Sequence, residues 1–355
     1  MFTKEQMYTP IWDTDTVWGE SLTMIRDKNN VAEAPLLYEP IQILKVTNLD
    51  GSKAYTEGED WEWKNGRLRL TKNSRIYCFT EEEIYPTKQP ALNTFFYMND
   101  RYLYHPANSY FIERQIFVTY TCERGGWKGV RPQLAEKKLL RSFERMRSGK
   151  KLNLVFYGDS ITVGADASVR HNLPPYQDGY GKLVYDALVA RYGTHITYTN
   201  TAVGGKETIW AEENIEERVN AYEPDLVVLA FGMNDGSKSQ EQFEERIRNM
   251  IRLIRAKKPE CEFILVATSL PNRLLTDPRA AFWGNQWQFK EALVRIEQDP
   301  EMPGVAVADI TGMHRYLLEH KRFEDLSSNM INHPNDFFHR CYAQFLIGML
   351  INESI

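Results

Sequence analysis

The sequence is poor in cysteine and contains no long hydrophobic run. Its four cysteines, among 355 residues, are far apart and form no C-x-x-C pair: Cys78, Cys122, Cys261 and Cys341. This spacing predicts neither a zinc site nor a redox pair, and it favours buried free thiols. No apolar run approaches the ~18 residues needed to span a bilayer, so no membrane partner is expected.

The chain also lacks a large excess of positive charge. A net charge of -5 and a pI of 5.9 provide no broad cationic surface for phosphates, which argues against a nucleic-acid partner. The first residues contain no basic segment followed by an apolar run. We therefore expect a cytoplasmic protein, or a secreted one if a signal peptide has been removed. A neutral or weakly charged substrate is favoured, and a homo-oligomer is compatible with the sequence.

Residues 1–132 have the pattern of an antiparallel β domain. Tyr, Trp, Thr and Val occur there in short stretches separated by Asn, Asp and Gly. The clearest element is a hairpin, in which Trp and Leu alternate on either side of Asn65-Gly66, a pair suited to a type I′ turn. Further strands are expected at residues 41–46, 75–79, 93–98 and 116–121. The pattern predicts a β-sandwich resembling a jelly roll.

The rest of the chain alternates between strands and helices. Residues 133–150 are charged, with apolar residues at helical spacing, which predicts a connecting helix over 133–147. Within residues 151–355, short apolar strands are expected at 152–157, 195–199, 225–231, 262–267 and 304–309. Amphipathic helices are expected between them, most clearly over 240–255. This alternation predicts a parallel sheet with helices on both faces and a ligand site beyond the carboxyl ends of the strands.

Two of the loops that follow these strands carry candidate catalytic groups. Ser160, in Gly158-Asp159-Ser160, is either a nucleophile activated by a neighbouring base or only the cap of a helix. Gly204-Gly205-Lys206 follows the next strand but is no phosphate loop, because Glu follows the lysine where Ser or Thr is required. Gly205 either exposes its N–H to a developing oxyanion or only forms a tight turn.

Two further loops carry an amide and an imidazole. Asn234 follows the third strand, where its carboxamide either donates to the same oxyanion or stabilises its own turn. His333 lies in a loop before the last helix, and a single loop histidine is usually only structural. However, serine, glycine, asparagine and histidine occupy four separate loops in that chain order, and this combination is specific.

Residues 151–350 resemble the SGNH, or GDSL-type, hydrolase family. The matching motifs are Gly158-Asp159-Ser160, Gly205, Gly232-x-Asn234-Asp235 and His333-Pro334. The resemblance implies a flavodoxin-like three-layer α/β/α fold and metal-free ester hydrolysis with no cofactor. It also implies that Ser160 is the nucleophile and His333 the base. The implied oxyanion donors are the N–H groups of Ser160 and Gly205 and the side chain of Asn234.

One position departs from the family pattern. Members usually carry an aspartate three residues before the histidine, where this chain has Met330. The third member of a triad fixes the imidazole tautomer, and its loss in a serine protease costs about 10⁴ in kcat. We expect a main-chain carbonyl near Met330 to take its place, with Asp336 and Asp325 as the alternatives. Asp336 is equally well interpreted as a helix-capping residue.

The order of the two halves resembles the carbohydrate esterases of family 2, which include acetyl xylan and mannan esterases. This resemblance implies a serine esterase that removes acetyl groups from carbohydrate through an acetyl-enzyme. Trp283 and Trp287 are candidates for the wall of a sugar pocket, or for a core contact, since they are one helical turn apart. A lipase-like or thioesterase-like hydrolase of other small esters is one alternative. A carbohydrate-binding protein with a silent hydrolase half, suggested by the missing aspartate, is the other.

Overall fold

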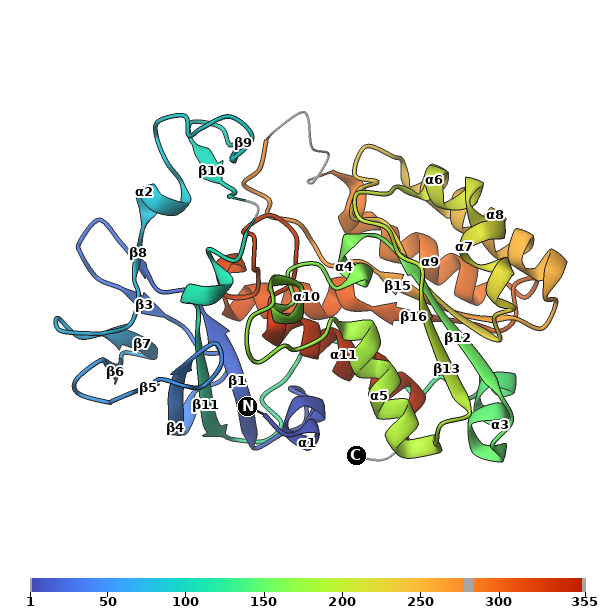
Figure 1. Cartoon of the computed structure of the whole chain (residues 1–355), viewed down its shortest axis with the longest axis horizontal. Helices are drawn as coiled ribbons and strands as arrows, with labels where there is room; N and C mark the ends of the chain where they lie inside the picture. The colour runs from blue at the N-terminus through green and yellow to red at the C-terminus, as the bar shows by residue number, and fades with distance from the viewer. Residues whose placement is uncertain (1, 107, 277–283, 353–355) are drawn as a thin grey trace.

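The computed structural model describes residues 2–106, 108–276 and 284–352. Figure 1 shows a strand-rich N-terminal half, which we call the β half, beside a larger half in which helices flank a sheet, which we call the hydrolase half. The last helix, α11 (Asp336–Leu350), contacts strand β1 (Thr16–Leu22) of the β half as well as helix α5 (Tyr180–Tyr192) of the hydrolase half. The end of the chain therefore joins the two halves.

The hydrolase half is built on a five-stranded sheet. Its strands are β12 (Leu152–Gly158), β13 (Ile196–Asn200), β14 (Leu226–Ala230), β15 (Glu262–Ala267) and β16 (Val305–Asp309). Their order across the sheet is β13-β12-β14-β15-β16, and every neighbouring pair is parallel. Numbered along the chain, this is the 2-1-3-4-5 order of flavodoxin-like folds. The five expected strands and the parallel sheet are confirmed.

Helices cover both faces of this sheet because successive strand residues point to opposite sides. In β12, Leu154 and Phe156 pack into one core, whereas Val155 and Tyr157 pack into a second one. The first face is covered by α5, α10 (Ile310–His320) and α11. The second is covered by α6 (Thr208–Glu213), α7 (Ile215–Arg218), α8 (Gln240–Lys257) and α9 (Phe289–Gln298). The result is a three-layer α/β/α arrangement.

The described strands of the β half form four small sheets. The largest is antiparallel and has the order β1, β11 (Ile116–Cys122), β4 (Pro40–Asn48) and β5 (Ala54–Tyr55). A second antiparallel sheet contains β3 (Glu33–Ala34), β7 (Arg67–Leu70) and β6 (Trp61–Lys64). The two-stranded sheets pair β9 (Phe95–Tyr97) with β10 (Tyr102–Tyr104), and β2 (Ile25–Arg26) with β8 (Phe79–Thr80). The mainly antiparallel character is confirmed, and the jelly roll stays a prediction.

In the β half, one predicted element is confirmed and another differs in extent. The hairpin is confirmed, because β6 pairs with β7 across Asn65 and Gly66, whose φ angles of 52° and 71° suit a type I′ turn. The strand expected over 75–79 is wrong in extent, because only β8 forms there. The N–H of Arg75 donates to the Asp60 carboxylate and is therefore not available to a neighbouring strand.

The helix expected over 133–147 also differs in extent. Helix α3 spans Leu140–Ser148, and the residues before it run along α11, where the N–H of Ala135 donates to the carbonyl of Met349. Helix α3 begins where it does because the Glu262 carboxylate, on β15, accepts hydrogen bonds from the N–H groups of Arg141 and Ser142. A distant carboxylate thus satisfies the free N–H groups of the first helical turn.

The two halves share one continuous hydrophobic core. The core on the α11 face of the parallel sheet extends into the β half, where it includes Val17, Phe117 and Val118. A smaller cluster joins Phe79, Leu103 and Phe111 of the β half to Leu275, Met330 and Ile331 of the hydrolase half. The proposed domain limits at 1–132, 133–150 and 151–355 stay a prediction, since the core runs across them.

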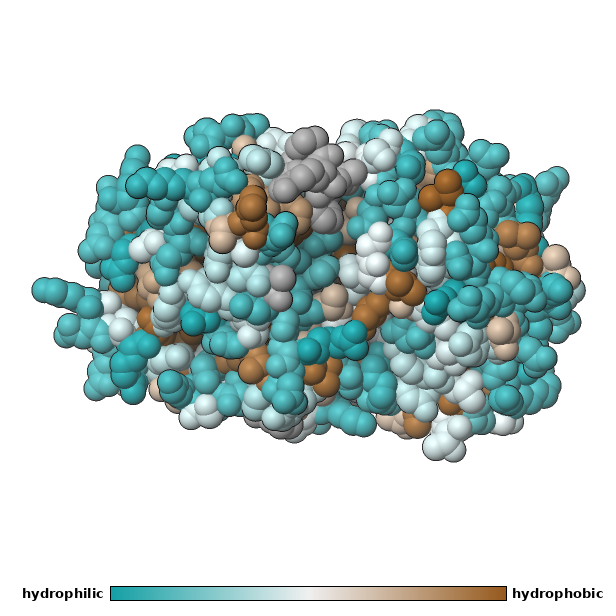
Figure 2. All heavy atoms as spheres, turned by 45° about the horizontal axis from the view of Figure 1, so that its top comes forward, coloured by the Kyte–Doolittle hydropathy of each residue, from teal (hydrophilic) through white to brown (hydrophobic). Residues whose placement is uncertain are grey.

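The surface gives no sign of a large apolar face on the side that Figure 2 shows. Hydrophobic residues form small separate patches there within a mostly hydrophilic surface. Scattered exposed apolar side chains of this kind are normal for globular proteins. Among the helices of the described ranges, none is long and apolar enough to cross a bilayer.

Candidate active site

Ser160 lies at the carboxyl edge of the parallel sheet, where β12 turns sharply into the short helix α4 (Ser160–Val163). The turn requires glycine, because a Cβ on Gly158 would lie 2.5 Å from the carbonyl oxygen of Ala230 on the neighbouring strand. Asp159 caps the helix, accepting a hydrogen bond from the N–H of Ile161 at 3.0 Å. The capping role considered for Ser160 therefore belongs to Asp159, and Ser160 is left as the first helical residue.

The Ser160 hydroxyl contacts the imidazole of His333. The distance between Ser160 Oγ and His333 Nε2 is 2.9 Å. The other ring nitrogen, Nδ1, lies 2.7 Å from Oδ2 of Asp166. About a fifth of the His333 and Asp166 side chains is exposed, so the group is partly open to solvent. Serine, histidine and aspartate thus form a continuous hydrogen-bonded chain.

Asp166 is none of the acceptors expected from the sequence. The expected main-chain carbonyl near Met330 is wrong, because the carbonyl oxygen of Met330 accepts a hydrogen bond from Asn272 Nδ2 at 2.9 Å. Met330 itself is fully buried in the cluster between the two halves, next to apolar side chains such as Phe79 and Leu103. An apolar residue occupies the family's aspartate position because the β half covers it.

The two aspartates proposed as alternatives are also not at the imidazole. Asp336 is the first residue of α11, and its carboxylate accepts a hydrogen bond from the N–H of Ser168 at 2.9 Å. Asp325 accepts from the N–H of Thr23 at 2.8 Å and from the guanidinium of Arg322. Both side chains are buried and directed to other partners, so neither can orient His333.

Asp166 is placed by the chain that follows α4, residues 164–179, which we call the aspartate loop. Gly164 ends α4 in the left-handed region, at φ 83°, and turns the chain back. The N–H of Ala165 then donates to the carbonyl of Ser160 at 2.9 Å. Asp166 also has a positive φ, 59°, which aspartate tolerates better than most residues. The sequence signal for Asp166 is a carboxylate close behind α4, whereas the expected acceptors all lie near His333 in the chain.

A second imidazole contacts the same carboxylate. His171 Nε2 lies 3.0 Å from Asp166 Oδ1, the oxygen that His333 leaves free. Burial alone would raise the pKa of Asp166, but the hydrogen bonds from His171 and His333 outweigh it and bring that pKa below its ordinary value. The bond to Asp166 in turn raises the pKa of His171. Asp166 is therefore an ionised acceptor at neutral pH.

The glycine and asparagine loops meet next to Ser160. A Cβ on Gly204 would lie 3.6 Å from the Cβ of Ser160, so this loop runs directly against the serine. Gly205 follows with a φ of 73° and is exposed. Asn234 Nδ2 donates to the carbonyl of Lys206 at 3.1 Å, and this bond links the loop after β14 to the loop after β13. The carboxamide carries a second N–H beyond that bond.

The structure describes only one of the two candidate tryptophans. Trp283 lies outside the described residues. Trp287 lies in a 3₁₀ helix, Asn285–Gln288, and 46% of it is exposed. Trp287 is therefore not a core residue, and a role in contacting a ligand stays a prediction.

The comparison with known families agrees with the fold. The sequence model of the GDSL-like lipase/acylhydrolase family matches residues 156–341, just over half of the chain. The chain therefore belongs to the GDSL-like lipase/acylhydrolase family, and the resemblance seen in the sequence is confirmed. No curated protein sequence matches the chain.

Several solved structures are similar to this chain. One is a two-domain esterase (CEX) active on acetylated mannans, co-crystallized with mannopentaose. It is 20% identical, with a TM-score of 0.47, and the match covers 61% of this chain and 54% of that one. A catalytic mutant of Axe2, an acetylxylan esterase from Geobacillus stearothermophilus, is 19% identical with a TM-score of 0.46, covering 58% and 97%. LAE5, an alpha/beta hydrolase from the metagenome of Lake Arreo, Spain, is 22% identical with a TM-score of 0.42, covering 56% and 95%. The match thus spans about half the length of the mannan esterase.

Proposed function

We propose that the protein is a serine esterase that removes acetyl or other short acyl groups from carbohydrate through an acyl-enzyme. One observation carries the proposal: Ser160 Oγ lies 2.9 Å from His333 Nε2, and His333 Nδ1 lies 2.7 Å from Asp166. A serine hydroxyl is a weak nucleophile by itself, and a histidine oriented by a carboxylate is the arrangement that activates it.

In the acylation step, Asp166 holds the proton of His333 on Nδ1, which directs the lone pair of Nε2 to Ser160. Nε2 takes the hydroxyl proton as Ser160 Oγ forms a bond to the acyl carbon, and Asp166 stabilises the resulting imidazolium. The bond between the acyl carbon and the alcohol oxygen then breaks, and His333 gives its proton to the leaving alcohol. In deacylation, His333 removes a proton from water, which attacks the acyl-enzyme, and the acid is released as Ser160 regains its proton.

The negative charge on the acyl oxygen needs donors during both steps. We propose the N–H groups of Ser160 and Gly205 and the second N–H of Asn234 for this role. The first N–H of a helix has no acceptor within that helix, which leaves the Ser160 N–H free to donate to substrate. The bond from Asn234 to Lys206 supports the proposal, because it fixes the carboxamide in advance of the reaction.

The proposal of a carbohydrate substrate has a different basis from the proposal of ester hydrolysis. It follows from the resemblance of the chain, a β half before an SGNH half, to family 2 carbohydrate esterases. The exposed indole of Trp287 supports it as a surface on which a sugar could stack. The alternative of a carbohydrate-binding protein with an inactive hydrolase half is not supported, because it depended on a missing aspartate. Asp166 is hydrogen-bonded to His333.

Three substrate sets test the proposal: 4-nitrophenyl acetate, 4-nitrophenyl octanoate and a panel of acetylated oligosaccharides. We expect hydrolysis of the acetate, little hydrolysis of the octanoate, and acetate release from at least one oligosaccharide. Equal turnover of the octanoate would indicate a lipase-like enzyme instead, and no turnover would indicate a binding protein. Ser160→Ala is the control. It should abolish hydrolysis with an unchanged circular dichroism spectrum, and more than about a tenth of wild-type kcat would remove Ser160 from the mechanism.

A further inference from the structure

His333 is carried by a compact loop, residues 327–334, which we call the histidine loop. Its ends meet in a β-bridge between Ser327 and Pro334. Inside it, Oδ1 of Asn329 accepts hydrogen bonds from three main-chain N–H groups, those of Ile331, Asn332 and His333. The carbonyl of His333 accepts a hydrogen bond from the N–H of Ser328. These bonds make the loop one compact unit, so the position of His333 depends on how that unit is held by its surroundings.

Both ends are held by one side chain of the β half. Gln115, immediately before β11, has an exposed fraction of 1%. Its Nε2 donates to the carbonyl of Ser327 at 2.9 Å, at the start of the loop. Its Oε1 accepts from Nδ2 of Asn335 at 3.0 Å, immediately after the end of the loop. Nε2 also lies 3.1 Å from the carbonyl of Glu324. One carboxamide thus bridges the two chain segments that enter and leave the histidine loop.

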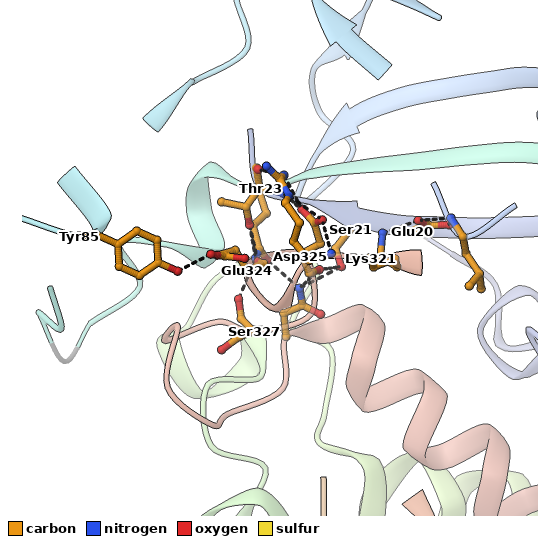
Figure 3. A network of polar contacts seen from close by, with 12 residues as sticks. Glu20, Ser21, Thr23, Tyr85, Lys321, Glu324, Asp325 and Ser327 are labelled. Carbon is orange, nitrogen blue, oxygen red and sulfur yellow. Dashed lines mark hydrogen bonds and ion pairs between the residues drawn. The ribbon is translucent and has the colours of Figure 1, made fainter. Parts of the chain in front are cut away.

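Neighbouring residues of the β half complete this attachment, as Figure 3 shows. The hydroxyl of Ser21 donates to the carbonyl of Asp325, and the same carbonyl accepts from Asn335 Nδ2 at 3.0 Å. The hydroxyl of Thr23 donates to the carbonyl of Glu324 at 2.6 Å. These side chains are buried, so water cannot replace the bonds that they make.

The apex of the histidine loop is covered from the same side. Met330 has a φ of 61° and no exposed surface, and it packs in one cluster with Phe79, Leu103 and Phe111 of the β half. A methionine in the left-handed region is strained, so the surrounding contacts must hold it there. The β half therefore contacts the histidine loop at its ends through hydrogen bonds and at its apex through apolar packing.

We propose that Gln115 is a positioning residue for His333, and that the β half is for this reason a working part of the active site and not only an accessory domain. The inference rests on the proposed esterase function. Gln115 does not touch the reacting atoms; it fixes the ends of the unit that carries the imidazole. Misplacement of a catalytic group by about 1 Å can cost on the order of 10²-fold in rate, so loss of this bridge should appear in the chemical step.

Gln115→Met tests the proposal, because methionine has nearly the same shape as glutamine but neither donates nor accepts strongly. The matched control is Leu68→Ala, which removes a buried side chain of the β half that belongs to the main core and not to the cluster around Met330. Both changes destabilise the β half, and only the first removes a bond to the histidine loop. If Gln115→Met does not fold, Gln115→Ala serves instead, since it removes both the donor to Ser327 and the acceptor for Asn335 without placing a charge among buried carbonyl groups.

The measurement is kcat/KM for two acetates that differ in their need for a proton from His333. A nitrophenolate leaves without protonation, whereas the ethoxide of ethyl acetate requires it. We expect the Gln115 variant to lose about 10-fold on 4-nitrophenyl acetate and about 10²-fold on ethyl acetate, at a temperature where circular dichroism shows it folded. Leu68→Ala should change both values by the same factor.

Three results distinguish a failure of this inference from a failure of the proposed esterase function. Unequal losses in the Gln115 variant support positioning, because a smaller folded fraction would lower both values equally. Equal losses, or losses no larger than those of Leu68→Ala, overturn the role of Gln115 while the esterase function stands. A wild-type protein that hydrolyses neither ester, and whose Ser160 does not react with a fluorophosphonate, overturns the proposed function and this inference together.

Discussion

The aspartate loop and the histidine loop both contribute to the hydrogen-bonded chain that ends at Ser160, but they are held by different parts of the molecule. The aspartate loop is bonded to α4, through the carbonyl of Ser160, and to the first turn of α11, through the carboxylate of Asp336. The histidine loop is bonded to the hydrolase half through Asn272, and to the β half chiefly by Gln115. One loop is therefore positioned within the hydrolase half, and the other requires both halves.

This difference has a consequence for folding as well as for catalysis. Asp166 is six residues from Ser160, so a single short turn fixes their separation. Gln115 is more than two hundred residues from the histidine loop, and contacts at such separations form only after a large loss of chain entropy. We expect the Ser160–Asp166 geometry to survive perturbation of the β half better than the Ser160–His333 geometry.

The largest expected effect comes from removing the carboxylate of the aspartate loop. Asp166→Asn should lower kcat by about 10³–10⁴, because the amide can no longer stabilise the imidazolium and can favour the wrong tautomer of His333. Steady-state kinetics on 4-nitrophenyl acetate measures the loss. Asp325→Asn is the comparison, since Asp325 does not contact His333. A kcat within tenfold of wild type in Asp166→Asn would mean that His333 is oriented by something else during turnover.

A second change separates the stability of the interface between the halves from the positioning of His333. Glu20 of the β half and Lys321 of the hydrolase half form an ion pair with no exposed side-chain surface. Glu20 also accepts hydrogen bonds from the N–H of Leu37 at 3.0 Å and the hydroxyl of Tyr120 at 2.7 Å. Lys321→Met leaves this carboxylate without its cation, and it should reduce the free energy of unfolding by about 3–5 kcal/mol.

Urea unfolding measures that loss, and kcat of the folded variant should stay within about threefold of wild type. Adding Glu20→Gln to Lys321→Met should recover part of the stability, because no unpaired charge is then buried. A tenfold fall in kcat under conditions where Lys321→Met is fully folded would contradict the comparison. It would show that the whole interface, and not Gln115 in particular, positions the imidazole.

The sequence allowed the five strands of the parallel sheet and the four candidate loops to be predicted, because each depends on local patterns. Short apolar runs indicated β12 and β14, and Gly158, two residues before Ser160, marked the turn. The acceptor for His333 could not be predicted in this way. Met330 stands at the family's aspartate position because of packing against the β half, and Asp166 replaces it from another loop. Both facts depend on contacts between residues far apart in the chain.

The proposed oxyanion donors all belong to the hydrolase half, and this allows a test by combination of variants. Asn234→Ala should lower kcat by about 10²–10³ with little change in KM, as when one fixed donor to the transition state is lost. Its effect on activation free energy should add to that of Gln115→Met within about 0.5 kcal/mol, since the two act on different groups. Asp166→Asn and Gln115→Met both act through His333, so their combined loss should be smaller than the sum. Additivity in the second pair would mean that Gln115 does not act through His333.

The smallest expected effect concerns Asp336, which connects the aspartate loop to α11. Burial raises the pKa of this carboxyl to about 6, above the value of about 3.9 in an unfolded chain. Below about pH 4 the carboxyl is protonated in both states and contributes no pH dependence. Between about pH 4 and pH 6 only the unfolded chain releases the proton, so this group makes the protein less stable as pH rises, and the full penalty remains above pH 6.

Asp336→Asn removes that titration and keeps an acceptor for the N–H of Ser168. The stability of the variant relative to wild type should therefore rise by about 1–3 kcal/mol between pH 4 and pH 7. Its kcat should stay within about tenfold of wild type, because His333 is bonded to Asp166 and not to Asp336. Urea unfolding of both proteins at four pH values gives the difference directly. A constant difference across that range would show that Asp336 is already ionised in the folded protein at pH 4, held there by a favourable partner. Between about pH 4 and pH 6 the aspartate loop would then depend on a buried charge and not on a neutral carboxyl. A fall in kcat of the variant of 10³ or more would place Asp336 among the groups that orient His333.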